Sequence, residues 1–599
     1  MLFRSNLSRS AQATELNLAP WKDRVPLEML GRTTFPPIGE LPYLITLAPY
    51  GFYWFKLEEK PPEPSKHEPF PEFETLVVPA GSTWVTLERT RRIFERDVLP
   101  AHLARTRWFP QRSAYAISTK VTSAIPVTEE GASRSWLAIF ESIQHGKMQR
   151  YTLPIRVDWV RFDRERYNPI ALAAVRQAAR EGTLFDVATD KEFIELLLDN
   201  VRHSRTTTNG VDKLVFQPTA KLLQEPEVKI EHVHAVETEQ SNSTSLVDES
   251  FVVKLYRRIE AGINPEIEMG RFLTDVVGFA NTPDLLGSVE LVEGDRRSAV
   301  AIIHRLIPNQ GDAWSVAASY LDRFVEERRL LSAEEKKSES SEQINSLRYM
   351  TQIGKRVAEM QMALASRPDT PDFAPEPATA NDLKKWHENF NAGVARVFEA
   401  LQQHRVSARE SDRKLIDALL HYQDDLPVLA DSFLTEPQLI LKARHHGDLH
   451  LGQLLIAKDD ILIIDFEGEP RRSLAERRCK APAARDVAGL LRSIDYAAGA
   501  AMMRARAAVP DDGSSTLFSD LETWRDIAAE TFLFAYRENL TDTRLWPQDS
   551  LAAERLLKFF LLEKVFYEIE YELAHRPDWL SVPLDGALRI LASETEVDT

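Results

Sequence analysis

Residues 446–453 read His-Gly-Asp-Leu-His-Leu-Gly-Gln, and residues 464–467 read Ile-Asp-Phe-Glu. The two stretches place Asp448 five residues before Gln453, and Asp465 twelve residues after Gln453. The segment is typical of a strand, a loop and a second strand. A loop carboxylate can orient a hydroxyl group, and the side-chain oxygens of Gln453 and Asp465 are hard ligands that suit Mg²⁺. These three residues are therefore the candidate chemical centre.

The same order and spacing occur in kinases, where H-R-D-L-x-x-x-N precedes D-F-G. In that chemistry an aspartate orients the acceptor hydroxyl and Mg²⁺ neutralises the triphosphate. We therefore predict that Asp448 is catalytic, that Gln453 and Asp465 bind Mg²⁺, and that ATP is the phosphoryl donor. A buried His-Asp pair in a turn is the alternative, and the ordered set of three residues disfavours it.

The composition limits the classes of protein to which this chain can belong. The chain has 599 residues, of which 43% are hydrophobic and 28% charged, so we expect several globular domains. A formal net charge of -17 argues against a dedicated surface for nucleic acid or for an anionic membrane. The single cysteine, Cys479, fits a reducing compartment, and no stretch has the apolar length of a membrane span. We expect a cytoplasmic protein.

Changes in composition along the chain predict an α+β fold with two kinase-like lobes. A small all-β domain is expected at the N-terminus, followed by a proline-rich linker. A mixed cap subdomain, a strand-rich N-lobe and a helical C-lobe follow, and the C-lobe carries the catalytic loop. The expected bounds are 1–58, 59–84, 85–215, 216–310 and 311–599.

The nucleotide side of the site is predicted around a strand lysine. Lys254 lies on an expected strand, and Asn264 with Pro265 opens a helix that carries Glu266 and Glu268. This is the layout in which a lysine and a helix glutamate hold the phosphates of a kinase nucleotide. Helical phase alone does not choose between the two glutamates, and we prefer Glu268.

A polar segment precedes this strand. Residues 239–245 include Ser241 and Ser243, whose hydroxyl groups and backbone N–H groups can cover phosphate oxygens. Clusters of serine and asparagine are also common in ordinary turns.

The acceptor side is predicted from one helical face. Lys564, Glu568 and Tyr571 are spaced i, i+4 and i+7, which places them on one side of a helix. Hydrogen-bonding groups beside an aromatic ring suit a sugar, whereas a Lys–Glu surface pair beside an incidental tyrosine is the alternative. Asp486 either braces the catalytic loop or interacts only with a helix dipole. For His450 we favour a structural role.

Four stretches resemble maltokinases, a family of aminoglycoside-phosphotransferase-like sugar kinases. They are HGDLHLGQLL, IDFEGEP, ARDVAGLLRSIDYAA at 484–498 and EKVFYEIEYELAHRPDWL at 563–580. The segments at 239–273 and 308–314 resemble the nucleotide lobe of that family, and TRWF at 106–109 resembles its N-terminal cap. The family tends to have histidine where this chain has Gln361, so a functional role for that position is in doubt.

Residues 1–58 resemble a different protein, the closing β-sandwich of trehalose synthase, through NLSRSAQ and FPPIGELPYLITLAPYGFYWFKL. The chain therefore resembles the rear portion of a trehalose synthase–maltokinase fusion. The amylase-like barrel does not fit in these residues, so we do not expect maltose–trehalose interconversion.

The resemblance implies transfer of the ATP γ-phosphoryl group to the anomeric hydroxyl of maltose. The product would be maltose 1-phosphate for α-glucan synthesis, and trehalose synthase is a possible partner. A kinase for another sugar or an aminocyclitol is the first alternative. A non-catalytic carbohydrate-binding or scaffold chain is the second.

Overall fold

A computed structural model describes most of the chain. The chain divides into two units. The first spans 1–72, 315–346 and 501–522, and the second spans 73–314, 347–500 and 523–599. The described residues are 2–6, 8, 12–29, 35–47, 52–59, 74–79, 87–110, 117–128, 135–144, 146–159, 170–227, 229–236, 241–330, 341–434, 440–508 and 515–595.

The start of the chain is all-β, as the sequence predicts. Alternation builds its core, because Ile45 and Leu47 are buried whereas Leu44, which directly precedes Ile45, is exposed. Residues 60–73 of the expected linker lie outside the described part. An antiparallel sheet has the order β1 (Leu2–Ser5), β5 (Phe52–Glu59), β3 (Arg24–Glu28), and a second pair joins β2 (Gln12–Leu16) to β4 (Tyr43–Leu47).

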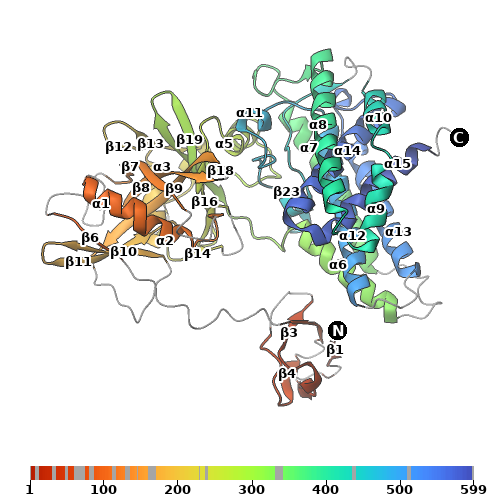
Figure 1. Cartoon of the computed structure of the whole chain (residues 1–599), viewed down its shortest axis with the longest axis horizontal. Coiled ribbons are helices and arrows are strands. Elements are labelled where there is room, and N and C mark those ends of the chain that lie inside the picture. The colour runs from red at the N-terminus through yellow and green to blue at the C-terminus, as the bar shows by residue number, and fades with distance from the viewer. Residues whose placement is uncertain are drawn as a thin grey trace. The chain divides into compact units, whose positions relative to one another are not determined.

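The first large sheet has seven strands. Helices α1 (Glu88–Ile93) and α2 (Leu99–Leu103) lie against it (Figure 1), and Phe94 and Leu99 from this helical segment are buried against Phe140. Strand β6 belongs to this sheet, so part of the expected linker is structural. The order is β6 (Thr75–Val77), β10 (Ala171–Gln177), β11 (Arg180–Asp186), β9 (Lys147–Asp158), β8 (Ser135–Gln144), β7 (Thr119–Pro126), with β17 (Arg258–Ile259) paired to β9.

The second sheet also has seven strands and carries the lysine strand β16 near its middle. Strand β12 and the first residues of β13 precede residue 216, so this sheet begins earlier than the expected N-lobe. Helices α3 (Lys191–Arg202), α4 (Ala220–Gln224) and α5 (Pro265–Arg271) accompany it. The order is β12 (Thr206–Thr208), β13 (Lys213–Pro218), β18 (Leu285–Glu293), β19 (Arg296–Arg305), β16 (Phe251–Leu255), β15 (Ser243–Val247), β14 (Val233–Ala235).

The rest of the chain is mostly helical, as expected for a C-lobe (Figure 1). Helix α14 is typical: Asp549 caps it by accepting from the Ala552 N–H, and Phe559 and Phe566 are buried. The helices are α6 (Ala313–Leu330), α7 (Ser341–Leu364), α8 (Ala380–His404), α9 (Glu410–Leu420), α10 (Asp425–Phe433), α11 (Leu474–Arg477), α12 (Ala484–Ala508), α13 (Ser515–Asn539), α14 (Ser550–His575) and α15 (Ser581–Thr595).

A short hairpin lies between Gln453 and Asp465. Strands β22 (Leu454–Ala457) and β23 (Asp460–Ile463) are antiparallel, and Leu454 is opposite Ile463. This register brings the residues just outside the hairpin together, because the Ile464 N–H donates to the Gln453 carbonyl at 2.9 Å. Residues distant in sequence therefore meet at the open end of the hairpin. Strand β21 (Leu441–Lys442), which pairs with β20 (Glu376–Pro377), leads into the catalytic loop.

Within the described residues, no helix is both long enough and apolar enough to cross a membrane.

Candidate active site

Helix α12 is hydrogen-bonded to the loop that carries Asp448. Asp486 accepts hydrogen bonds from the backbone N–H groups of His446 at 2.9 Å and Gly447 at 3.0 Å. Gly447 has a φ of +86°, a left-handed conformation that favours glycine. Of the two roles considered for Asp486, the loop brace is therefore the one that the structure supports.

Gln453 and Asp465 are neighbours across the open end of the hairpin. Gln453 Nε2 donates to Asp465 Oδ2 at 2.9 Å. Asp465 has a φ of +65°, which is uncommon for a residue other than glycine and often marks a functional position. The positive φ turns the carboxylate towards Gln453 and Lys254, and Lys254 Nζ lies 3.3 Å from Asp465 Oδ1.

The lysine of β16 pairs with Glu266, which corrects the pairing we preferred. Lys254 Nζ donates to Glu266 Oε2 at 3.0 Å, whereas Glu268 contacts Arg444 and Arg478. Two residues correspond to about 200° around an α-helix, so both glutamates cannot face the same lysine. The rotation of α5 about its axis decides between them.

Glu266 is the centre of a buried polar cluster. It accepts from the Tyr256 hydroxyl at 2.6 Å and lies 3.5 Å from His304 Nε2. Burial opposes its ionisation, but Lys254 and His304 outweigh burial and hold the pKa of Glu266 below its usual value.

A third carboxylate, Glu467, also contacts Lys254. Burial raises its pKa to about 8, and the nearby charges of Glu266 and Asp465 act in the same direction. One ammonium thus faces three carboxylates. Carboxylate oxygens of Glu266, Asp465 and Glu467 all lie within 4.8 Å of one another, so the cluster has the donor atoms and the charge for a cation.

The two serines that were predicted to cover phosphate, Ser241 and Ser243, have different surroundings. Ser243 begins β15, where it pairs with Leu255, and its hydroxyl accepts from Arg257 Nε at 2.7 Å. Arg257 is buried and also pairs with Asp186 at 2.8 Å. Ser241 is exposed in the turn before β15, and residues 237–240 lie outside the described part.

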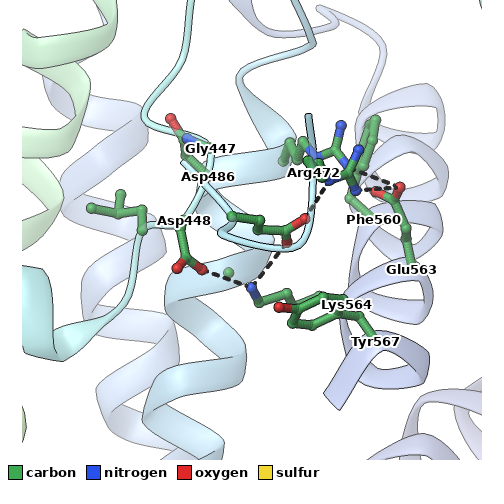
Figure 2. A pocket seen from close by; sticks show the side chains of 12 residues that line it. Gly447, Asp448, Arg472, Asp486, Phe560, Glu563, Lys564 and Tyr567 are labelled. Carbon is green, nitrogen blue, oxygen red and sulfur yellow. Dashed lines mark hydrogen bonds and ion pairs between the residues drawn. The ribbon is translucent and has the colours of Figure 1, made fainter. Parts of the chain in front are cut away.

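Lys564 of α14 reaches the catalytic loop (Figure 2). Its Nζ donates to Asp448 Oδ1 at 3.1 Å and to Glu469 Oε1 at 3.2 Å. Glu469 is also paired with Arg472. Burial opposes the ionisation of Glu469, but Lys564 and Arg472 outweigh it and lower its pKa to about 2.

The other two residues of the predicted acceptor face have different partners. Glu568 accepts at 2.6 Å from Nη2 of Arg492, a buried residue of α12. Tyr571 stacks on His575 with ring centroids 4.5 Å apart. Of the three predicted residues, therefore, only Lys564 contacts Asp448.

Two cavities adjoin this part of the C-lobe. The one at Asp448 (Figure 2) holds about 20 Å³, enough for a water molecule but not for a sugar. A second cavity of about 370 Å³ is lined by residues of α8, α14 and the segment after Asp465. Glu469, Arg472, Glu563 and Tyr567 line both cavities.

Glu469, Arg472 and Tyr567 were not among the residues predicted from the sequence. Glu469 was visible inside IDFEGEP, two residues after Glu467. Tyr567 follows Lys564 by three residues, so it shares the helical face that we had identified. Its ring lies 4.8 Å from Lys564 Nζ.

Two further polar residues have structural partners. His450 Nδ1 accepts from the Gly452 N–H at 3.0 Å, which agrees with the structural role that we favoured. Gln361 is buried, donates to the Ala483 carbonyl at 3.0 Å and accepts from Tyr536 at 2.6 Å.

Two sheets followed by a helical lobe, with the site at the hairpin, define an α+β fold of the aminoglycoside-phosphotransferase and kinase type. A structure of glucosamine kinase with glucosamine, ADP and inorganic phosphate matches 80% of this chain and 93% of that chain, with a TM-score of 0.53 and 22% identity. A second crystal form of glucosamine kinase gives a TM-score of 0.55, also at 22% identity, and covers 79% of this chain and 94% of that one. The expected fold, with a small β domain in front, is confirmed.

The sequence is similar to two groups of characterised proteins. Glucosamine kinase of Streptacidiphilus jiangxiensis is 28% identical over 347 residues, which are 58% of this chain and 70% of that protein. Glucosamine kinase of Mycolicibacterium smegmatis is 27% identical over 363 residues, 60% of this chain and 79% of that protein.

The N-terminal unit has separate relatives. Residues 1–54 match the family described as the maltogenic amylase C-terminal domain. The trehalose synthase/amylase of Mycolicibacterium smegmatis is 53% identical over 64 residues, which are 11% of each chain. The match thus covers about a tenth of that enzyme.

Proposed function

We propose that this chain transfers the γ-phosphoryl group of ATP to the anomeric hydroxyl of maltose and forms maltose 1-phosphate. The observation that carries the proposal is the meeting of Asp448 with Lys564 beside the Gln453–Asp465 pair and the Lys254–Glu266 pair. In the reaction, the anomeric oxygen forms a bond to the γ-phosphorus while the bond to the bridging oxygen of ADP breaks. The hydroxyl proton passes to Asp448.

The side chains around Asp465 fit Mg²⁺. Gln453 and Asp465 would hold the ion, and it would neutralise charge on the triphosphate. The excess of carboxylates over ammonium groups in this cluster favours a bound cation. Lys254, kept charged and in place by Glu266, would bind the α- and β-phosphates.

The charges near the acceptor side support a neutral sugar. Glu469 is paired with Lys564 and Arg472, and Glu563 with Arg472 and Arg485. Glu570 is paired with Arg396. An ammonium group on the acceptor would require a carboxylate that is not already neutralised. Instead, Glu469, Glu563 and Glu570 each have an internal cation, and Glu476, which also lines the larger cavity, accepts from Ser473.

The 370 Å³ cavity supports an acceptor larger than one ring, because small-molecule sites usually enclose about 300–1,000 Å³. Tyr567 offers an aromatic surface to a sugar ring, and Asn389 and Arg471 offer hydrogen-bond donors. The similarity of residues 1–54 to an amylase C-terminal domain supports a role in α-glucan metabolism.

Phosphorylation of glucosamine is the second candidate, because two glucosamine kinases align with 58% and 60% of this chain at 28% and 27% identity. It would require the 2-ammonium group to displace one of the internal cations described above.

The experiment is incubation of the purified chain with MgATP and maltose, followed by phosphorus NMR of the product. We expect a new anomeric phosphate signal, coupled to the C1 proton and formed in equal amount to ADP. ADP release without a sugar phosphate, or a phosphate on another hydroxyl, would refute the proposed reaction.

A further inference from the structure

Glu268 lies on the side of α5 that faces away from Lys254. Its carboxylate accepts from Arg444 Nη1 at 2.7 Å, from Arg478 Nη2 at 2.6 Å and from Arg478 Nε at 2.9 Å. We name Glu268, Arg444 and Arg478 the α5 clamp. Arg444 precedes Asp448 by four residues, and Arg478 directly follows α11. The clamp therefore joins the nucleotide-side helix to the catalytic loop.

The charges of the α5 clamp are removed from solvent to different degrees. The side chain of Arg444 is 2% exposed, that of Glu268 13% and that of Arg478 24%. Burial opposes ionisation of Glu268, but the two arginines outweigh it and lower its pKa. Partly desolvated, bidentate pairs of this kind fix geometry more firmly than exposed surface pairs do.

Apolar packing supports the clamp. The rings of Phe272 and Phe373 stack with centroids 3.6 Å apart, and the Arg444 guanidinium lies 5.2 Å from the Phe373 ring centre. Gly262, in the loop before α5, packs closely on α11, because a Cβ atom there would lie 3.2 Å from the side chain of Leu474. Figure 1 shows α5 and α11 side by side.

The loop after this helical segment, which ends at Val276, is also tied to the catalytic hairpin. The Ile463 N–H donates to the Asn281 carbonyl at 2.8 Å, and Asn281 Nδ2 donates to the Ile461 carbonyl at 3.0 Å. Ile463 lies two residues before Asp465. The helix is thus joined by the clamp to the segment before Asp448, and the loop after it is joined to the strand before Asp465.

We infer that Glu268 is a positioning residue: through Arg444 and Arg478 it sets the rotation of α5 that lets Glu266 reach Lys254. The clamp thereby couples the nucleotide site to the catalytic loop. This inference rests on the proposed phosphotransfer function, because its kinetic consequence is measured in that reaction.

A double-mutant cycle tests the coupling, because Arg478 and Glu266 have no direct contact among the interactions above. We expect E266Q to lower kcat/KM for ATP and R478Q to lower it by about threefold to tenfold. The variant that combines both changes should be no worse than E266Q alone. E260Q, which removes an exposed carboxylate paired with Arg258, is the matched control and should have wild-type kinetics. Additive losses in the combined variant would overturn the inference.

Hydrogen exchange provides a readout that does not depend on activity. In R478Q and E268Q we expect faster amide exchange across residues 265–271, with α14 unchanged. E260Q should leave exchange in α5 as in the wild type. If α5 keeps its protection in both clamp variants, the clamp does not position the helix. If the wild type lacks kinase activity while the exchange result holds, the proposed function fails but the clamp stands.

Discussion

The ammonium of Lys564 lies 3.1 Å from Oδ1 of Asp448 and so joins helix α14 to the catalytic loop. The same ammonium lies 3.2 Å from Oε1 of Glu469. Burial would lower the pKa of Lys564, but the charges of Asp448 and Glu469 raise it above its ordinary value. Lys564 therefore stays charged at neutral pH. It binds one oxygen of Asp448 and so fixes the orientation of that carboxylate.

Replacement of Asp448 with asparagine should lower kcat by about 10²- to 10⁴-fold, because the acceptor hydroxyl loses its proton acceptor. Folding should persist, since Lys564 keeps its pair with Glu469. Circular dichroism and a steady-state ADP-release assay measure the two properties. A folded D448N variant with near-normal turnover would exclude this role for Asp448.

Replacement of Lys564 with methionine removes a charged hydrogen bond and keeps much of the side-chain volume. Such a bond contributes about 1.5–3 kcal/mol, so kcat/KM for maltose should fall by about tenfold to a hundredfold. The KM for ATP should stay nearly constant. K384M, at an exposed position of α8, is the control. Equal changes in both KM values would place Lys564 outside the acceptor side.

The meeting of Gln453 and Asp465 was predictable from the sequence. These residues are twelve apart, and one hairpin whose register follows from a two-residue turn brings them together. The β domain was predictable for a similar reason, because the apolar and partly β-branched run at 43–47 is a local signal.

The glutamate that pairs with Lys254 was not predictable. Asn264 fixes where α5 begins, but the rotation of the helix depends on Arg444 and Arg478, which lie 176 and 210 residues away from Glu268. The partners of the predicted acceptor face were not predictable for the same reason. The 3.6-residue period placed Lys564 and Glu568 on one side of α14, but Glu568 pairs with Arg492 from another helix.

Replacement of Asp465 with alanine should weaken binding of MgADP much more than binding of maltose, because a hard carboxylate ligand is lost. We expect at least about a tenfold loss for MgADP and less than about twofold for maltose. Titration calorimetry with each ligand separates the two effects. Equal losses for both ligands would count against a metal-binding role.

Replacement of Glu469 with glutamine should change stability in a pH-dependent way. The folded-state pKa of Glu469 is lowered from 4.5 to about 2, so its stabilising effect is present above about pH 4.5 and is lost as the pH falls towards 2. Loss of one partner of a buried ion pair typically costs about 3–5 kcal/mol. The variant should therefore unfold more easily at pH 7, and its stability should depend less on pH between about 4.5 and 2. Denaturant titrations across this range measure both effects, and an unchanged slope would show that Glu469 has no depressed pKa.

The central claim is that a kinase-type site in this chain acts on a neutral disaccharide. The ratio of kcat/KM for maltose to kcat/KM for glucosamine, measured with saturating MgATP and direct quantification of each sugar phosphate, tests it most directly. Because Glu469, Glu563 and Glu570 near the acceptor side are neutralised internally, the ratio should exceed about a hundred, which corresponds to about 2.7 kcal/mol of discrimination. A ratio below one would contradict the account and identify an amino sugar as the acceptor.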